Sequence, residues 1–141
     1  METVREYDPA TTRLASIKVG GGVLEHLEYE YDAADRITEI TNPTEPAWGR
    51  GSFEYDAHDR LVRASGPWGG TPEWTTDHFR FDALGNLECR GGSSPTTCAG
   101  GTELTYPGPA ASPALYRRPH APLSVASESG SPLGIAHDET G

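Results

Sequence analysis

The chain has 141 residues, of which 17 are glycine and 12 are proline, and only 35% are hydrophobic. This composition excludes long helices and the core of a three-layer α/β domain, and it favours one domain's worth of a larger protein. Acidic residues outnumber basic ones by 21 to 11, and the net charge of −10 repels phosphate backbones. We therefore expect no nucleic acid partner.

Apolar runs in this sequence are short. None approaches the roughly 18 residues that a membrane span needs. Residues 1–6 lack the basic and apolar regions of a signal peptide. We expect no membrane span and no signal peptide in this chain.

An internal repeat dominates the sequence. Residues 29–37, 53–61 and 79–87 align without gaps as aromatic, any residue, aromatic, Asp, Ala. Residues 7–14 form an earlier copy with one extra residue in its turn, residues 103–108 form a degenerate copy, and a late copy begins at His137. The signature residues are Tyr7, Asp8, Arg13, Tyr29, Tyr31, Asp32, Asp35, Arg36, Phe53, Tyr55, Asp56, Asp59, Arg60, Phe79, Phe81, Asp82, Gly85 and Asn86.

Each copy predicts a β-hairpin. Apolar and polar residues alternate before the Asp of each copy. This period of two residues is typical of a strand with one apolar face. The Asp side chain caps an Asx turn, and a three-residue hairpin loop needs a left-handed residue at Asp35, Asp59 or Gly85.

This loop predicts which residues face each other across each hairpin. It places an aromatic ring opposite an aliphatic residue in the pairs Tyr31 with Ile37, Tyr55 with Leu61, and Phe81 with Leu87. It also places Asp32 opposite Arg36 and Asp56 opposite Arg60, whereas Asn86 leaves the third copy with a hydrogen bond at best.

The predicted fold class is all-β, with stacked antiparallel hairpins of about eight strands that form part of an open, curved sheet or shell. Residues 1–91 hold the hairpin repeats. Residues 92–141 form an irregular Gly/Pro/Ser-rich connection with the degenerate repeat and a truncated final repeat. We expect exposed strand edges, so that the isolated chain self-associates or is marginally stable, and we expect the region after Gly91 to be sensitive to proteases.

The pattern Tyr-Asp-x-x-Gly-Arg-Leu, at spacings in the low twenties, resembles the Rhs or YD-repeat family of bacterial Rhs and toxin-complex proteins and, distantly, of teneurins. The resemblance covers residues 1–91 well and residues 116–125 loosely. Asp35 and Asp59 depart from it, since the family has Gly there. The Asp-Pro-x-Gly-Leu block near which family members cleave themselves is also missing, because Asp8-Pro9 is followed by Ala10.

The resemblance implies a non-catalytic segment of a hollow shell that encloses or presents a polypeptide toxin or cell-contact domain. It implies that the partners are the rest of the parent repeat chain and a polypeptide cargo, in a secreted or cell-surface bacterial protein. The alternative is a carbohydrate-binding or adhesive repeat module with glycans as partners.

No enzymatic, metal or cofactor site is predicted. The five histidines do not fall at metal-ligand spacing. The alternating glutamates indicate a solvated sheet face and not a carboxylate pair for glycoside hydrolysis. The serines lack a Gly-x-Ser-x-Gly elbow. We expect no enzyme activity, no metal site and no cofactor.

Cys89 and Cys98 lie nine positions apart across a Gly/Ser/Pro loop. Two interpretations remain open, a hairpin disulfide in an oxidising compartment or free thiols in a loop.

The three tryptophans, Trp48, Trp68 and Trp74, all fall between hairpins and beside Gly or Pro-rich stretches. Each ring either plugs the seam between neighbouring hairpins, which we favour, or stacks on a sugar as a glycan contact.

Overall fold

A computed structural model describes residues 1–46, 49–67, 73–107, 120, 122–127 and 132–135. The chain divides into two units, Met1–Thr76 and Asp77–Gly141, and each is described by itself. The strand β7 (Thr75–Phe81) begins in the first unit and continues into the second.

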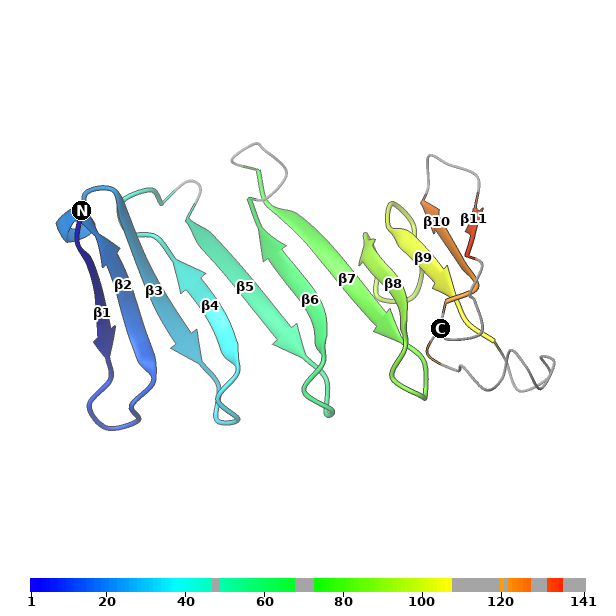
Figure 1. Cartoon of the computed structure of the whole chain (residues 1–141), viewed down its shortest axis with the longest axis horizontal. Helices are drawn as coiled ribbons and strands as arrows, with labels where there is room; N and C mark the ends of the chain where they lie inside the picture. Colours follow the sequence, from blue (N-terminus) through cyan, green and yellow to red (C-terminus); the bar gives the residue numbers. More distant parts are fainter. Residues whose placement is uncertain (47–48, 68–72, 108–119, 121, 128–131, 136–141) are drawn as a thin grey trace. The chain divides into compact units, whose positions relative to one another are not determined.

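The first unit consists of three hairpins (Figure 1). Their strands are β1 (Thr3–Tyr7) with β2 (Leu14–Val19), β3 (Glu25–Tyr31) with β4 (Ile37–Thr41), and β5 (Arg50–Tyr55) with β6 (Leu61–Gly66). A single 3-10 turn, η1 (Gly20–Gly22), connects β2 to β3. In each hairpin we call the first strand outgoing and the second the return strand.

The second unit contains most of β7, followed by β8 (Leu87–Gly92), β9 (Thr102–Thr105), β10 (Ser124–Ser127) and β11 (Leu133–Gly134). β8 pairs with β7 and β9, and β10 pairs with β9 and β11, always antiparallel.

The predicted fold class is confirmed. The described residues form an open antiparallel sheet whose strand order is the chain order, and they contain no α-helix. The expected number of about eight strands is too low, because the short strands β9, β10 and β11 follow Gly92. A short segment with few apolar residues, such as Thr102–Thr105, can form a strand because its backbone groups pair with those of the neighbouring strand.

The predicted register of the hairpins is confirmed as well. Tyr31 pairs with Ile37, Tyr55 with Leu61, and Phe81 with Leu87, each next to a register shift in the outgoing strand. The predicted left-handed residues have positive φ, at 66° for Asp35, 61° for Asp59 and 88° for Gly85. The extra residue of the first copy shifts this role to Thr12, with a φ of 60°.

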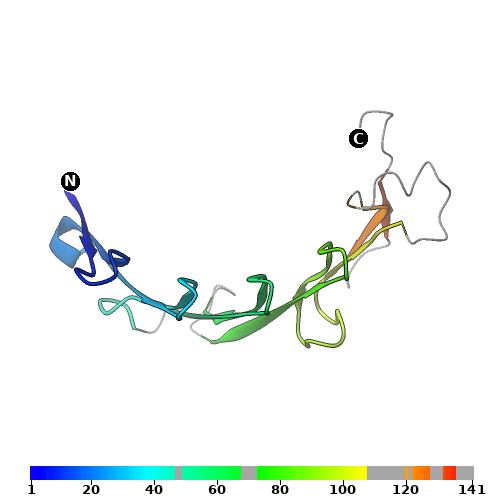
Figure 2. The same cartoon turned by 90° about the horizontal axis from the view of Figure 1, so that it is seen from below.

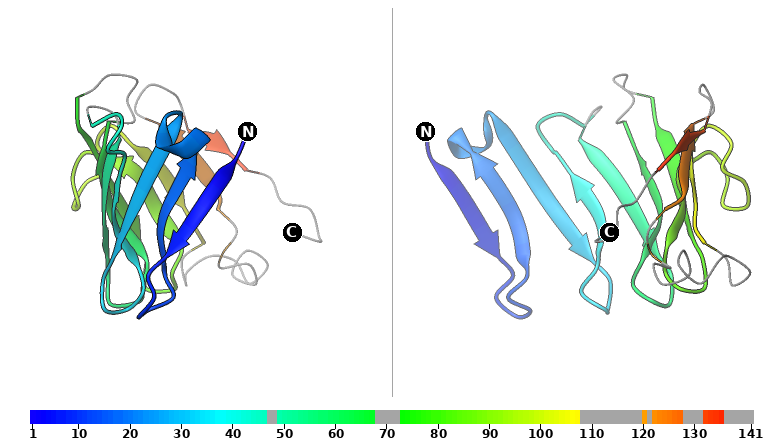
Figure 3. Two further views of the ribbon diagram at one scale, coloured as in Figure 1. Left: turned by 90° about the vertical axis from the view of Figure 1, so that its left-hand side faces the viewer. Right: turned by 45° about the vertical axis from the view of Figure 1, so that its right-hand side comes forward.

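Few side chains are buried in this sheet. Among the described residues only Ala64 and Cys89 are buried hydrophobic residues, and Ser16, Ser65 and Asn86 are buried polar ones. Figure 2 shows β1 to β6 as one layer whose hairpin tips follow one another in a row, and Figure 3 shows β1 to β4 side by side. Strand pairing and contacts between neighbouring hairpins therefore hold the first unit together, in place of a hydrophobic core between two layers.

Candidate functional site

Consecutive hairpins meet at a repeated joint. We use the term inter-hairpin joint for the meeting of a return strand with the next outgoing strand, at β2 with β3, β4 with β5, and β8 with β9. In all three, the residue two positions after the opening aliphatic residue pairs with the residue three positions before a tyrosine. The pairs are Ser16 with Glu28, Glu39 with Ser52, and Cys89 with Glu103.

A tyrosine hydroxyl closes each of these joints. Tyr31 donates a hydrogen bond to the carbonyl oxygen of Leu14 at 3.0 Å, and Tyr55 donates to that of Ile37 at 2.9 Å. In the second unit, Tyr106 donates to the carbonyl oxygen of Leu87 at 3.1 Å. Burial raises the pKa of both Tyr55 and Tyr106, so these hydroxyls keep their protons. Each tyrosine thus tethers its hairpin to the one before.

The degenerate copy at residues 103–108 is therefore a working repeat, since Tyr106 makes the same contact as Tyr31 and Tyr55. The pairing of β10 with β11 follows the same register. Ser124, two positions after Pro122, pairs with Gly134, which precedes His137 of the late copy by three positions. His137 itself lies outside the described residues.

An arginine at the start of the return strand first holds its own turn. Nε of Arg36 donates to Oδ2 of Asp32 at 2.7 Å, and Arg60 does the same to Asp56 at 2.7 Å. The hydrogen bond from Arg60 lowers the pKa of Asp56 to about 2, and that from Arg36 lowers the pKa of Asp32. The other carboxylate oxygen of the turn aspartate accepts hydrogen bonds from the backbone. Oδ1 of Asp56 accepts from the amides of His58 and Arg60.

The same arginine also reaches the following hairpin. Nη1 of Arg36 donates to Oδ1 of Asp59 at 2.9 Å and to the carbonyl oxygen of Asp56 at 3.1 Å. The guanidinium carbon of Arg36 lies 5.1 Å from the ring centroid of Tyr55, a cation–π distance. One guanidinium therefore contacts two turns and the joint tyrosine.

Arg13 repeats this arrangement one hairpin earlier. It forms an ion pair with Asp35, donates to the carbonyl oxygen of Asp32 at 3.3 Å, and lies 5.5 Å from the ring centroid of Tyr31. The two departures from the family's glycine, Asp35 and Asp59, are the residues that accept these ion pairs. Asp adopts a positive φ less readily than Gly does, but at these positions its carboxylate forms an ion pair with an arginine of the preceding hairpin.

The third copy uses amide chemistry instead. Nδ2 of Asn86 donates to Oδ2 of Asp82 at 2.7 Å, the hydrogen bond that the sequence predicts. Although burial acts in the opposite direction, hydrogen bonds from the amide groups of Asn86 hold the pKa of Asp82 below its ordinary value. Oδ1 of Asn86 lies 2.5 Å from Nδ1 of His120, at the end of the long connection after β9.

A like-charge pair lies on the polar face of the first unit. Glu30 and Glu39 are directly opposite across β3 and β4, a destabilising arrangement. Nη2 of Arg50 contacts Oε2 of Glu39 at 2.9 Å, and Glu39 and then Glu30 raise the pKa of Arg50. Arg50 thus offsets the repulsion between these two carboxylates.

Trp74 lies beside Arg50 on this face, with the guanidinium carbon 5.8 Å from the ring centroid. Its exposed fraction is 49%, so the expectation that this ring is a buried seam plug is wrong. Strand β7 begins directly after Trp74. Trp48 and Trp68 lie outside the described residues.

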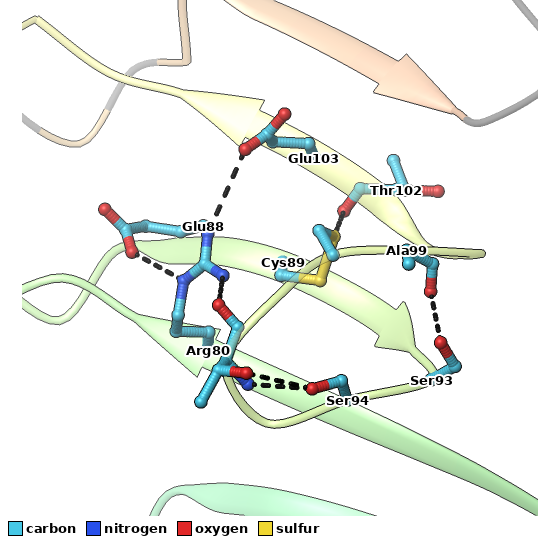
Figure 4. The surroundings of a disulfide bond; sticks show 10 residues. Arg80, Glu88, Cys89, Ser93, Ser94, Ala99, Thr102 and Glu103 are labelled. Carbon is cyan, nitrogen blue, oxygen red and sulfur yellow. Dashed lines mark hydrogen bonds and ion pairs between the residues drawn. A yellow bond between two sulfur atoms is a disulfide. The ribbon is translucent and has the colours of Figure 1, made fainter.

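Cys89 and Cys98 form a disulfide with their Cα atoms 5.6 Å apart. Figure 4 shows this bond beneath the connection between β8 and β9, next to Arg80. Arg80 contacts Glu88 at 3.1 Å and Glu103 at 3.9 Å, and it donates to the carbonyl oxygen of Thr96 at 3.3 Å. The disulfide and Arg80 together hold the connection against β8.

The remaining candidates form no chemical site among the residues described. No group of three or more His, Cys, Asp or Glu side chains in those ranges is arranged to hold a metal ion. Within the same ranges, no helix is long and apolar enough to cross a membrane.

The first unit thus brings together at its turns and joints the signature residues Arg13, Tyr31, Asp32, Asp35, Arg36, Tyr55, Asp56, Asp59 and Arg60. The second unit brings Asp82 and Asn86 together in one turn, whereas Tyr7 is 59% exposed. What sequence reasoning missed is the reach of Arg13 and Arg36 into the next hairpin and the tyrosine tether. The recurrence of Arg followed 22 or 23 positions later by a left-handed Asp was the signal for the first of these.

The chain matches no family model and no curated protein. Among solved structures it is similar to crystal structures of TcdB2-TccC3-Cdc42, at 28% identity and a TM-score of 0.58, and of TcdB2-TccC3-TEV, at 26% and 0.57. It is also similar to the Photorhabdus luminescens Tc holotoxin pore, at 25% identity and a TM-score of 0.56. Each match covers 74% of this chain and 6% of the other chain, so this chain spans a small part of these proteins. The matches confirm the resemblance to Rhs and YD-repeat toxin proteins.

Proposed function

We propose that the chain is a non-catalytic stretch of wall in a secreted or cell-surface YD-repeat shell protein, where it helps to enclose or present a polypeptide cargo. Its partners are then the neighbouring hairpins of that shell and the cargo. The observation that carries the proposal is the inter-hairpin joint, which recurs in one register at β2 with β3, β4 with β5, and β8 with β9.

A joint of this kind suits a wall. Each joint uses backbone pairing, one tyrosine hydroxyl and, in the first unit, one arginine whose guanidinium contacts the turn of the next hairpin. Because the same register and the same tyrosine hydrogen bond recur at these three joints, hairpins can add in series without a second layer. The polar side chains of the joints bind to other groups of the same chain. A structural repeat is expected to use its polar groups in this way, whereas a substrate site would leave some of them to bind a substrate.

The solved structures support the same role. The similar proteins are TcdB2-TccC3 assemblies and a Tc holotoxin, and the chain has the fold of a segment of them. Because the match covers 6% of that chain, the proposed role of this chain is that of a small stretch of wall.

A chimera tests this function. The segment of a TcdB2-TccC3 complex on which the chain superposes is replaced by this chain, and protease digestion of the complex's hypervariable C-terminal region, the cargo of this test, is followed over time. We expect the cargo of a monodisperse chimera to stay protected. A matched chimera with Tyr55→Phe and Arg36→Ala, which weakens one joint, should release or expose cargo faster. A monodisperse chimera whose cargo is digested as fast as free cargo would contradict the proposal.

A glycan-binding role is the second candidate, and the exposed ring of Trp74 beside Arg50 favours it. Glycan-array screening of the chain with Trp74→Ala as the matched control tests it. Specific binding that Trp74→Ala removes, with unchanged thermal stability, would establish the adhesive role. Identical array signals from both proteins exclude Trp74 as a sugar contact.

A further inference from the structure

A pocket opens on one face of the first unit, over the neighbouring strands β3, β4 and β5 (Figure 1). Its volume is about 350 Å³, at the lower end of the roughly 300–1,000 Å³ that is usual for ligand pockets. The lining residues that decide its chemistry are the apolar Leu27, Ile40 and Phe53, the acidic Glu25 and Glu45, and Gly51. The pocket therefore has apolar walls and acidic residues in one place.

A glycine leaves room for this pocket. Gly51 pairs with Ile40 at the joint of β4 with β5 and lies four positions before Tyr55. At the joint of β2 with β3, the residue four positions before Tyr31 is Leu27. Gly51 does not have a positive φ, so its backbone does not require glycine. The second joint thus lacks the apolar side chain that the first joint has at the same position.

The pocket and Trp74 belong to opposite faces of the sheet. Because successive residues of a strand point to opposite faces, Gly51 and Arg50 differ in direction. The guanidinium of Arg50 contacts Glu39 and lies over the ring of Trp74. Arg50 therefore does not bring its charge to the pocket, and the pocket is separate from the candidate glycan contact.

Two carboxylates lie at the rim of the pocket. Glu25 and Glu45 both line it and are exposed. Burial, then Tyr31 and Glu25, raise the pKa of Tyr29, which places the charge of Glu25 on the same face as that ring. Within the described part of the chain, neither rim carboxylate forms an ion pair. The negative rim is thus available to a cation.

We infer that this pocket binds a lysine or arginine side chain from an extended segment of another polypeptide. The aliphatic stem of that side chain packs against the apolar walls in the place left by Gly51, and its cationic head lies beside Glu25 and Glu45. The inference goes beyond the wall function, because a pocket on one face takes its ligand whether or not the sheet belongs to a closed shell.

A polypeptide suits the surroundings of the pocket better than a free amine does. The apolar face continues beyond the pocket through Ile17, which pairs with Leu27, and Tyr29, which pairs with Ile40. Both side chains are only half-buried, so apolar residues beside the lysine would remove more apolar surface from water. The net charge of −10 complements a basic segment.

Peptide binding tests the inference. A fluorescein-labelled peptide, Ser-Leu-Lys-Leu-Ser, is titrated with the monodisperse 141-residue chain and followed by fluorescence anisotropy. A second peptide carries norleucine in place of lysine, which keeps the stem and removes the charge. We expect the lysine peptide to bind about threefold more tightly than the norleucine peptide, and this difference should shrink as the salt concentration rises.

Three variants of the chain separate the contributions of shape and charge. Glu25→Gln should weaken binding of the lysine peptide about threefold and leave that of the norleucine peptide unchanged. Gly51→Leu, which fills the pocket, should weaken binding of both peptides about tenfold. Glu54→Gln removes a carboxylate from the opposite face, where it pairs with Arg63, and as the matched control should bind both peptides like the parent.

The inference is overturned if neither peptide binds, or if Gly51→Leu keeps the circular dichroism spectrum of the parent and binds the lysine peptide equally tightly. If Gly51→Leu does not fold, Glu25→Gln decides, and equal affinities of Glu25→Gln and Glu54→Gln for the lysine peptide overturn the inference. These measurements use the chain by itself, so their failure is distinguishable from a loss of cargo protection in the chimera.

Discussion

The hydroxyl of Tyr55 donates a hydrogen bond to the carbonyl oxygen of Ile37 at 2.9 Å, across the joint between two hairpins. Removing this hydroxyl leaves a part-buried carbonyl without its donor, so Tyr55→Phe should destabilise the chain by about 1 kcal/mol in urea unfolding. Tyr7→Phe is the matched control, because the Tyr7 ring is exposed. Equal unfolding midpoints for the two variants would show that the tether contributes nothing.

Asp59 combines a left-handed backbone with an ion pair to Arg36. Asp59→Ala keeps the positive φ, loses the carboxylate and should destabilise by about 1 kcal/mol or more. Asp59→Gly loses the ion pair but gains backbone freedom, and its unfolding midpoint should stay close to that of the parent. A midpoint for Asp59→Gly as low as that for Asp59→Ala would mean that the carboxylate outweighs the backbone.

Arg50 offsets the repulsion between Glu30 and Glu39. Arg50→Met should lower the thermal midpoint at neutral pH, because the two opposed carboxylates lose their cation. Adding Glu30→Gln to Arg50→Met should restore stability, and failure of this rescue would assign the loss to packing against Trp74.

Asp56 links stability to acid pH. Its pKa is about 2 in the folded chain, mainly through the hydrogen bond from Arg60, against an ordinary value of 3.8. A depressed folded pKa stabilises the chain above the unfolded pKa, and this contribution is lost as pH falls from about 4 to 2. The acid branch of the unfolding free energy should be shallower in Asp56→Asn, which carries no titrating group there. Parallel acid branches for variant and parent would refute the linkage.

The disulfide between Cys89 and Cys98 closes a short loop of nine-residue separation. Loop-closure entropy gives it roughly 2–3 kcal/mol. Reduction should therefore lower stability and open residues 93–101 to limited proteolysis, monitored by mass spectrometry. Cys89→Ser with Cys98→Ser should behave like the reduced parent under both conditions, and an unchanged cleavage pattern on reduction would show that Arg80 alone holds the connection.

The exposure of Trp74 could not be predicted from the sequence. Gly and Pro around Trp74 indicate a connection between strands, but a connection ring is buried or exposed according to the residues that lie over it. In the folded chain Trp74 is half exposed beside Arg50, a residue 24 positions earlier that reaches it only once the sheet has formed.

The sequence by itself determined the hairpins. Asp32, the left-handed Asp35 and the pair of Tyr31 with Ile37 lie within a few residues of each other, so local turn chemistry and strand alternation suffice to predict their register. Tertiary structure alone decided how hairpins bind to one another. The contacts of Tyr55 with Ile37 and of Arg36 with Asp59 span 18 and 23 positions, and they exist only when two hairpins pair in one register. Such contacts depend on the backbone ladder between hairpins, which no local pattern within a single repeat specifies.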